Sequence, residues 1–555
     1  MLVVMTSAEY QLTILHTNDV HSRIEQTDKR SGPCAKELSA AGKCFGGVAR
    51  IRTMVKKLRS QYANQTLLLD AGDQFQGTLW FYTFGGIVTA EFMNHIGYDA
   101  MAIGNHEFDR GIAGLEPFAR NVTFPLLSSN MNLTNTPELR DVIKKSTIRI
   151  VNGQRIGVVG YTTTETPYIS SAGTVTFSKE LEAVQAEVDQ LTLQGVNKII
   201  AVGHAGFSVD LDLAKRLRNV DVIVGGHTNT FLYNGSSPSN EKIDGVYPTV
   251  VTSDSGQRVL VVQDYAYGKY LGELHVTFND EGRVTSWWGN PLLLDNSVPQ
   301  DPETLSMIAR YQPDIEKQKT KVVGQTYVDL LADRVKCRTT ECNLGNLVAD
   351  AMLRYNLQHT EDSWSDVSMS VVNAGSFRAS IVRGNITTET VIFVQPFRNT
   401  VDIIEVSGQT LKDVFEYCAE KWTEVSEDAF GGFLQVAGLQ VTYDISRPVG
   451  SRVVEILVTC TKCGVPKLEP IMMGRSYRLV ASSYIISGGD GFSMFPDKIL
   501  RRLPKESLDT DIMMEHIQRF SPITTGLEGR IRHLKPGTED NACVKGGAVV
   551  YTSPA

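Results

Sequence analysis

Short apolar runs that end in polar residues recur along the first half of the chain. Five of them are Leu12–Leu15, Leu67–Leu69, Met101–Ile103, Ile199–Val202 and Val222–Val224, and Asp, Asn or His follows each within a few positions. A run of this kind is typical of a buried strand that leaves a sheet at its C-terminal end. We therefore expect five strands that carry polar side chains to one sheet edge.

Stretches with helical spacing of apolar residues separate these strands. Residues 46–59 place apolar side chains on one helix face, and residues 179–194 repeat the pattern. The segment 259–278 has the character of two paired strands that close this half of the chain. The alternation of strand and helix over residues 10–301 predicts a layered α/β domain.

A proline-bounded break at Pro299–Pro302 divides the chain. The polar stretch after it has spaced apolar residues and predicts a linker helix over 302–321. A second α/β region is expected over 322–535, followed by a loose tail at 536–555. Its clearest expected elements are two helices and one strand, at 344–357, 411–422 and 367–372.

Composition and charge narrow the class of protein. A chain of 555 residues is too long for one core and suggests two to four domains, and 42% apolar residues leave enough side chains to bury. The net charge of −8 argues against nucleic-acid binding, which needs a basic surface. No apolar run of about 18 residues occurs, and no long hydrophobic tail of a lipid-anchor signal ends the chain. We expect a soluble protein without a membrane span.

The cysteines indicate an oxidising compartment. Three local pairs lie in turn-like segments, Cys34 with Cys44, Cys337 with Cys342 and Cys460 with Cys463, which suits small disulfide-closed loops. A zinc ribbon built on the third pair is the alternative, but no second C-x-x-C motif exists. Cys418 and Cys543 are left to pair with each other or with another chain. Five glycosylation sequons also favour a secreted glycoprotein, at Asn64, Asn121, Asn132, Asn234 and Asn385.

The polar residues after the five strands have the chemistry of metal ligands. Asp19 and His21 are two positions apart, so both can face one ion, and the spacing of His227 and Asn229 is the same. Asp73 can bridge two ions with its two oxygens. The candidate ligands are Asp19, His21, Asp73, Asn105, His204, His227 and Asn229. This mixed nitrogen and oxygen set suits zinc or manganese and does not suit calcium.

A lone histidine after a strand is more often structural than a ligand. Here, however, four of the ten histidines stand in these motifs, which favours a metal site with two ions. Two cations can neutralise an anionic ester and lower the pKa of water to roughly 7. His106 is placed to stabilise a transferring phosphoryl group or to protonate a leaving alkoxide, and Asp109 to hold its imidazole in the charged form. The chain lacks the G-x-x-x-x-G-K-[ST] and G-x-S-x-G motifs of other hydrolases.

These motifs, in this order, resemble the 5'-nucleotidase family, most closely the animal ecto-5'-nucleotidases and the related secreted apyrases. The segments that carry the resemblance include residues 12–23, 67–74, 104–109 and 225–233, and it extends from about Tyr10 to Ile531. It implies an α/β protein of two domains. The first, at 10–301, is a four-layer αββα metallophosphatase (calcineurin-like) domain. A helix joins it to a C-terminal α/β nucleotide-binding domain, the substrate-binding domain of the family.

The resemblance also implies roles for individual residues. One ion would be bound by Asp19, His21, Asp73 and Asn229. The other ion would be bound by Asp73, Asn105, His204 and His227. The catalytic pair would be His106 and Asp109. Zinc is the expected metal, with manganese, cobalt or magnesium as alternatives. In the second domain Arg338, Asn373, Arg378 and Arg383 would bind the nucleotide, Phe397 and Tyr484 would stack on its base, and Asp490 would bind the ribose.

The expected activity is hydrolysis of nucleoside 5'-monophosphates, AMP above all, to nucleoside and phosphate. An apyrase that removes phosphate from extracellular ATP and ADP is the first alternative. A secreted scavenger that binds nucleotides without turnover is the second. The resemblance further implies a homodimer formed through the second domain.

Overall fold

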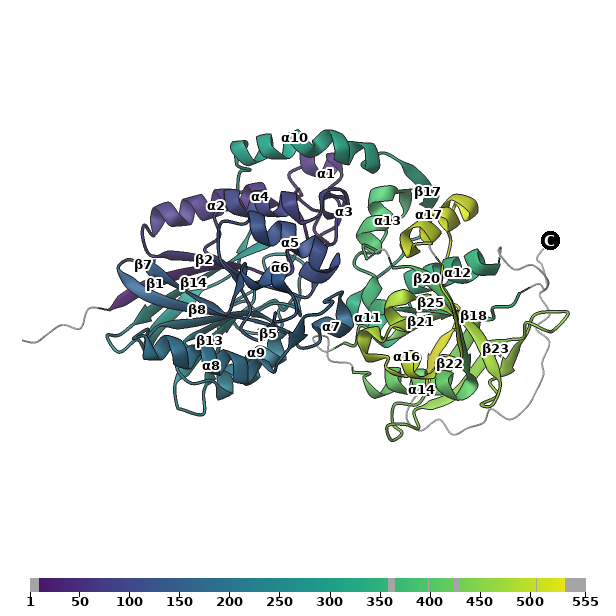
Figure 1. Ribbon diagram of the computed structural model, residues 1–555. Coiled ribbons are helices and arrows are strands. Elements are labelled where there is room, and N and C mark those ends of the chain that lie inside the picture. The colour runs from purple at the N-terminus through teal and green to yellow at the C-terminus, as the bar shows by residue number, and fades with distance from the viewer. Residues whose placement is uncertain (1–8, 358–364, 398, 424–428, 506, 535–555) are drawn as a thin grey trace, which may run out of the picture.

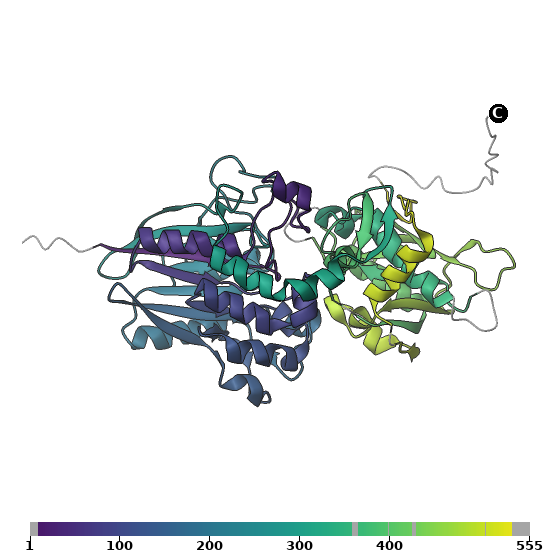
Figure 2. The ribbon, with the colours of Figure 1, turned by 90° about the horizontal axis from the view of Figure 1, so that it is seen from above.

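Two domains and one connecting helix make up the computed structural model, which describes residues 9–357, 365–397, 399–423, 429–505 and 507–534. The two domains lie side by side (Figure 1). Helix α10 (Pro302–Lys319) crosses from the first domain to the second, as the view from above shows (Figure 2). Asp301 caps its first turn, because the Asp301 carboxylate accepts a hydrogen bond from Thr304 N at 3.0 Å. The predicted tail at 536–555 lies outside the described residues.

Two sheets form the centre of the N-terminal domain. The eight-stranded sheet has the order β15 (Val284–Gly289), β14 (Tyr270–Phe278), β1 (Tyr10–Thr17), β2 (Thr66–Asp70), β3 (Ala100–Ala102), β4 (Leu126–Leu127) and β6 (Ile143–Lys144), with β16 (Leu292–Leu293) beside β14. The six-stranded sheet has the order β12 (Thr249–Thr252), β13 (Arg258–Val262), β11 (Val222–Val224), β10 (Ile199–His204), β8 (Gln154–Thr162) and β7 (Ser146–Val151).

Helices cover the outer face of each sheet. The longer ones are α2 (Val48–Gln61), α4 (Gly86–Ile96) and α5 (Gly111–Asn121) on the eight-stranded sheet, and α8 (Glu180–Leu193) and α9 (Phe207–Arg216) on the six-stranded sheet. Short elements lie in the connections: α1 (Lys36–Ala40), α3 (Leu79–Phe84), η1 (His106–Phe108), β5 (Met131–Asn132), α6 (Pro137–Arg140), α7 (Thr166–Ile169) and β9 (Thr176–Phe177).

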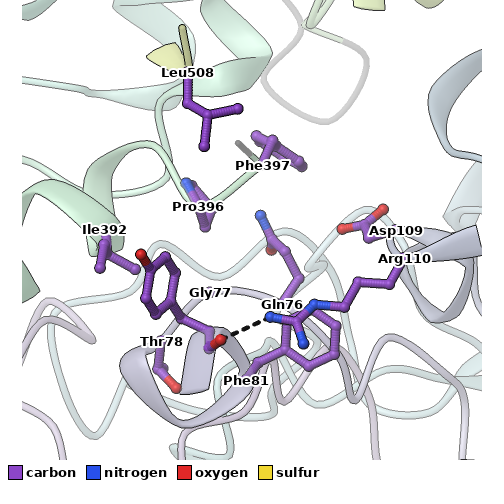
Figure 3. Close-up of a pocket in the computed structure, with 11 residues that line it drawn as sticks. Gln76, Gly77, Thr78, Phe81, Asp109, Arg110, Ile392, Pro396, Phe397 and Leu508 are labelled. Carbon is purple, nitrogen blue, oxygen red and sulfur yellow. Dashed lines mark hydrogen bonds between the residues drawn. The ribbon is translucent and has the colours of Figure 1, made fainter. Parts of the chain in front are cut away.

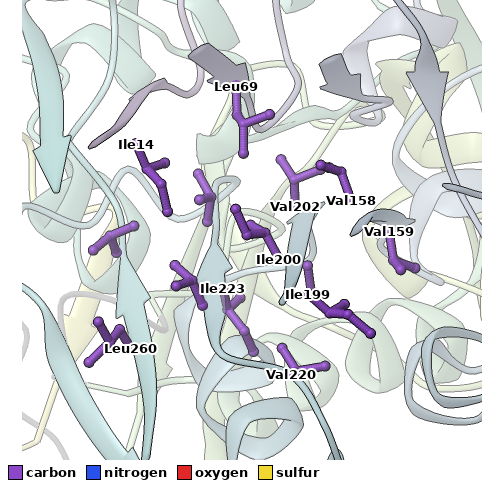
Figure 4. Packing of buried hydrophobic residues seen from close by; sticks show 14 of the residues in the cluster. Ile14, Leu69, Val158, Val159, Ile199, Ile200, Val202, Val220, Ile223 and Leu260 are labelled. Atoms are coloured by element: carbon purple, nitrogen blue, oxygen red, sulfur yellow. The ribbon is translucent and has the colours of Figure 1, made fainter. Parts of the chain in front are cut away.

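Alternate residues of one strand build two different cores. Ile14 of β1 faces the second sheet, where it joins Val202 and Ile223 in a buried cluster (Figure 4). Its neighbour Leu15 points the other way and packs in the cluster that includes Val55 of α2. Successive side chains of a strand point to opposite faces, so a strand that is covered on both sides is apolar throughout. The four-layer αββα prediction is confirmed.

Two expectations from the sequence pattern are wrong. The five metal-motif strands do not share one sheet edge, because β1, β2 and β3 belong to the first sheet and β10 and β11 to the second. The strands within 259–278 do not pair with each other. Strand β13 pairs with β11 and β12, whereas β14 crosses to the other sheet and pairs antiparallel with β1.

The C-terminal domain is also an α/β structure. Its five-stranded sheet has the order β21 (Leu434–Ala437), β18 (Met369–Asn373), β25 (Ser476–Ser482), β20 (Val401–Ser407) and β26 (Arg501–Leu503). A four-stranded sheet has the order β24 (Leu468–Pro470), β23 (Val453–Thr459), β22 (Leu439–Tyr443) and β27 (Ile531–His533), and β17 (Val322–Thr326) pairs with β19 (Gly384–Thr387). Its helices are α11 (Arg334–Thr339), α12 (Asn343–Leu357), α13 (Thr388–Val394), α14 (Gly408–Glu420), α15 (Ser483–Ile486), η2 (Ala374–Ser376), η3 (Gly489–Gly491), α16 (Met494–Lys498) and α17 (Asp509–Phe520).

Helices pack on both faces of the five-stranded sheet. Val372 of β18 packs in a cluster with α12, α13 and α17, while the adjacent Val371 packs with α14 on the opposite face. The described residues include no helix long and apolar enough to cross a membrane.

The three predicted disulfides are present. They join Cys34 to Cys44, Cys337 to Cys342 and Cys460 to Cys463. Cys418 is a free thiol on the buried face of α14, and burial raises its pKa to about 12. Its suggested pair, Cys543, lies outside the described residues.

Candidate metal centre and interdomain cleft

The candidate metal ligands come together where five parallel strands end. Asp19 and His21 follow β1, Asp73 follows β2, and Asn105 follows β3. From the facing sheet, His204 ends β10, and His227 and Asn229 follow β11. The carboxyl ends of parallel strands meet at one edge of a sheet, and here the edges of two packed sheets face each other.

Two groups of ligand atoms share one carboxylate. Asp19, His21 and Asp73 form the first group, with their ligand atoms all within 4.8 Å of one another. Asp73, His204 and His227 form the second, within the same distance. Since Asp73 belongs to both groups, its carboxylate would serve both cations.

Hydrogen bonds behind the ligands fix their orientation. His204 Nδ1 lies 2.7 Å from Ala71 O, and His21 Nδ1 lies 3.0 Å from Phe75 O, so each Nε2 is left to face the centre. Asn18 Nδ2 donates to Asp19 Oδ2 at 2.8 Å. A carbonyl that accepts the other ring N–H of a histidine orients the ring and makes it a more basic metal ligand, whereas the hydrogen bond from Asn18 holds the Asp19 carboxylate in place.

The donor set fits divalent cations. Asn105 Oδ1 and Asn229 Oδ1 are buried and have no hydrogen-bond partner among the described residues, although unsatisfied buried polar atoms are rare in native proteins. The electrostatics agree: burial disfavours the charged form of His204, yet Asp73 and Asp19 raise its pKa to about 10. This shift marks a strongly negative potential where the ligand atoms converge, which attracts positive charge.

The ligand-bearing loops hold an unusual backbone conformation. Asp19, His21, Asp73, His227 and Asn229 have positive φ angles of 50°, 50°, 59°, 79° and 56°. The left-handed region costs a non-glycine residue about 1–3 kcal/mol and is concentrated at functional sites. Gly72, at φ 91°, leaves room for the neighbouring loop, because a Cβ there would lie 2.7 Å from Gly104 N. The fold therefore gives up some stability to aim these side chains inward.

His106 and Asp109 lie at the open side of the centre. His106 Nδ1 is 2.8 Å from Asp109 Oδ2, and its Nε2 is 3.9 Å from Asp73 Oδ2. Burial opposes protonation of His106, but Asp109 and Asp73 together raise its pKa above the usual value. This arrangement places a proton donor beside the candidate metal ligands.

A cleft between the domains opens onto these residues. Its cavity of about 890 Å³ is lined by Asp73, Asn105, His106, Asp109, His227 and Asn229 from the first domain, and by Arg338, Asn373, Arg378, Phe397, Tyr484 and Asp490 from the second. Arg378 reaches across, and its Nη2 lies 3.1 Å from His21 Nε2. The structure thus brings most of the predicted metal and substrate residues to one cavity.

A smaller cavity of about 260 Å³ adjoins the cleft and shares Asp109 and Phe397 with it (Figure 3). Phe397 packs beside His106, with ring centroids 5.6 Å apart. The second aromatic, Tyr484, donates from its hydroxyl to Asp490 Oδ1 at 2.8 Å. The other Asp490 oxygen accepts from Asn373 Nδ2, also at 2.8 Å, so these three residues form one polar group at the far end of the cleft.

Arg383 is an exception among the predicted substrate residues. It lies in the exposed turn before β19 and does not line the cavity. Its backbone N donates to Asp329 Oδ1 at 2.9 Å, which fixes the turn rather than a ligand. We therefore leave Arg383 out of the proposed site.

The predictions from sequence did not include Glu107, which holds the loop of the bridging ligand. Glu107 is fully buried, and its Oε2 accepts from Asp73 N at 3.0 Å and from Gly104 N at 2.7 Å. Its Oε1 accepts from Gln74 N at 2.8 Å and Phe75 N at 3.2 Å. The only signal in the sequence was its place next to His106 within the 104–109 motif, which does not show that the carboxylate is buried.

Replacing Glu107 by Gln should loosen the metal centre. A glutamine amide presents N–H groups where two backbone N–H groups now find an acceptor, so the Asp73 loop shifts. We expect metal affinity to fall roughly 10- to 100-fold, as for other residues that orient metal ligands. The half-point of metal removal in a chelator titration measures this. Glu116→Gln, on the surface of α5, is the matched control, and equal metal affinity in both variants would contradict the assigned role.

Comparisons with known proteins agree with this architecture. Residues 12–231 match the family of calcineurin-like phosphoesterases, and residues 322–497 match the C-terminal domain of 5'-nucleotidases. The chain is 45% identical to a rat 5'-nucleotidase over 95% of its own length and 91% of the relative's. It is 44% identical to a human 5'-nucleotidase over 94% and 91% of the two chains.

A solved structure matches over nearly its full length. The 5'-nucleotidase precursor from Thermus thermophilus superposes with a TM-score of 0.86 at 36% identity, over 95% of this chain and 99% of that one. The likeness in fold therefore extends over both domains.

Proposed function

Because the chain belongs to the 5'-nucleotidase family, we propose that it hydrolyses nucleoside 5'-monophosphates, above all AMP, to the nucleoside and phosphate. The enzyme is a phosphate-ester hydrolase that depends on divalent metal ions. The observation that carries the proposal is the pair of ligand groups sharing Asp73 at the mouth of a cleft whose other wall bears arginines and aromatic residues.

The residues of the cleft have separate roles in the proposed reaction. Divalent cations held by the two ligand groups that share Asp73 would neutralise phosphoryl oxygens and would lower the pKa of water for attack on phosphorus. Arg338 and Arg378 bind the phosphate, since guanidinium groups match its oxygens in geometry and charge. His106 protonates the 5'-oxygen as the bond from phosphorus to that oxygen breaks, and Asp109 holds the imidazole for this step.

The nucleoside occupies the wall formed by the second domain. Phe397 and Tyr484 supply flat rings for a purine, worth about 1–3 kcal/mol per stacked base by analogy with single-strand binders. Asp490, which already accepts hydrogen bonds from Tyr484 and Asn373, accepts from the ribose hydroxyls. Both domains must therefore contact the nucleotide for turnover.

A substrate panel tests the proposal. We expect phosphate release from AMP to exceed release from ADP and ATP, measured side by side on the metal-loaded protein. Adenosine serves as the blank because it has no phosphate to lose. Release from ADP and ATP with AMP untouched would show an apyrase instead, and tight nucleotide binding without any release would show a scavenger.

Zinc is the proposed metal, because the donor set combines imidazole nitrogens with carboxylate and amide oxygens. Elemental analysis of the purified protein distinguishes zinc from manganese, cobalt and magnesium.

We also propose secretion, supported by the three disulfides, and a homodimer through the second domain, supported by the family resemblance. Light scattering measures the molecular mass in solution and so tests the dimer.

A further inference from the structure

The small cavity of about 260 Å³ lies between the two domains, beside the cleft (Figure 3). Among the described residues only Asp109 and Phe397 line both cavities, so the small one is a separate space. None of the candidate metal ligands, all of which the structure describes, lines it. Its wall combines residues of the first domain with residues of the second, among them Gln76, Phe81 and Arg110 with Ile392, Pro396 and Leu508.

Gln76 presents an unused carboxamide to this cavity. The residue is only 1% exposed, and its side chain points into the space toward Pro396 and Phe397 of the facing domain (Figure 3). Among the described residues neither its Nε2 nor its Oε1 has a hydrogen-bond partner. An amide that is both buried and unpaired is costly and rare in native proteins, so this one indicates a ligand that binds in the cavity.

The other polar groups around the cavity already have partners. The Thr78 hydroxyl donates to Ser22 O at 2.8 Å. Both oxygens of Asp109 are hydrogen-bonded within the first domain, and Arg110 donates to Tyr82 O at 2.8 Å. A buried water needs two to four polar partners, so the largely apolar remainder of the wall suits water poorly. The carboxamide is thus the main polar group that the cavity offers to a ligand.

The wall favours a flat and neutral molecule. Phe81, Tyr82 and Phe397 supply aromatic rings, which attract other rings by stacking. The opposite charges of Asp109 and Arg110 balance each other, which favours a neutral ligand over a phosphate ester. A carboxamide has an acceptor oxygen beside donor N–H groups, and it pairs at two points with the amino group and the adjacent ring nitrogen of adenine. The volume is just below the roughly 300–1,000 Å³ of drug-sized sites, so it suits a ring system and not a whole nucleotide.

We propose that the small cavity is a second binding site, which takes a neutral purine base such as adenine and pairs its hydrogen-bonding edge with the Gln76 carboxamide. The site is distinct from the wall that carries Tyr484, although it shares the Phe397 ring with the cleft. The bound base does not react. It contacts both domains, so its binding stabilises the arrangement of the domains in this structure. The proposal goes beyond the proposed function and does not depend on it.

Photolabelling locates the site in the unaltered, metal-loaded protein. The probe is 8-azidoadenine, which attaches to nearby side chains on illumination, and mass spectrometry identifies the labelled peptide. We expect label within residues 76–82, because residues of this segment line the small cavity and not the large one. An excess of adenine should prevent this label. Label confined to the large cleft, around Tyr484, overturns the proposal, as does a complete lack of label.

Competition for this label measures the affinity of the small cavity itself. Unsubstituted purine keeps both rings of adenine but lacks the amino group, so it cannot form the two-point pair. In the unaltered protein adenine should block the label at a concentration roughly 10- to 100-fold lower than purine does, the usual discrimination of such a pair. Gln76→Met keeps an unbranched side chain of similar length without the amide. In this variant adenine and purine should block the label at concentrations within about twofold of each other.

Gln395→Met is the matched control. Gln395 is also 1% exposed, and neither polar atom of its amide has a partner among the described residues, but it lines neither cavity. It should keep the preference for adenine. A preference retained by Gln76→Met overturns the proposed pairing, and so does its loss in both variants. The two proposals fail separately, because AMP hydrolysis without label at residues 76–82 removes this site and leaves the function standing.

Discussion

Replacing Asp73 by Ala should abolish turnover and empty both cation sites together. Among the described residues, Asp73 is the member that the two ligand groups share, so its loss should affect both sites. We expect kcat/KM for AMP to fall by roughly 10⁴-fold, because two electrostatic contributions of about 10²-fold each are lost at once. The number of metal ions per chain, measured by elemental analysis, should fall in parallel.

Asp221→Asn is the control for this prediction. Asp221 is a buried carboxylate just before β11, at the strand end opposite His227, and its Oδ2 accepts from Ile199 N at 2.9 Å. An asparagine oxygen can still accept that hydrogen bond, so metal content should not change. Retention of both ions by Asp73→Ala would disprove the shared site.

Replacing His106 by Ala should stop turnover while nucleotide binding survives. His106 belongs to neither ligand group, and its Nδ1 is held by Asp109 rather than by the centre. We expect kcat to fall between about 10²-fold and 10⁴-fold, the usual range for a general acid, with the Kd for AMP changed only severalfold. Single-turnover phosphate release and direct binding of AMP measure the two quantities.

His516→Ala is the matched variant here, because His516 is a half-buried histidine of α17 that does not line the cleft. Its kcat should equal that of the unaltered protein. Undiminished turnover in His106→Ala would remove His106 from the mechanism. A loss of AMP binding as large as the loss of kcat would instead assign it to substrate binding.

Local sequence pattern was sufficient to predict the separate elements. The apolar spacing of residues 46–59 predicted a helix, and α2 spans Val48–Gln61. The run at 199–202 predicted a strand, and β10 spans Ile199–His204. Both signals depend on residues within a few positions of each other, because side-chain burial in a helix or strand follows the local period.

Pairing between distant segments could not be predicted in this way. Strands β13 and β14 are neighbours in sequence and equally strand-like, yet β14 pairs with β1, in the register Tyr10 with Phe278. The choice depends on hydrogen bonds and burial between segments far apart in the chain. The same reason explains two further differences. Glu107 was missed because the backbone N–H groups around its carboxylate are brought there by the fold. Arg383 was included although it lies outside the cavity, because the fold places it in an exposed turn.

The sequence alone determined which chemical groups leave the ends of the strands, and therefore that cations and an anionic ester are the chemistry of this protein. Only the tertiary structure decided that the groups come from two facing sheets, that Asp73 lies in both ligand groups, and that Gln76 faces a cavity with walls from both domains. The type of each residue is known directly from the sequence. The distance between residues hundreds of positions apart is set only when both sheets and both domains have packed.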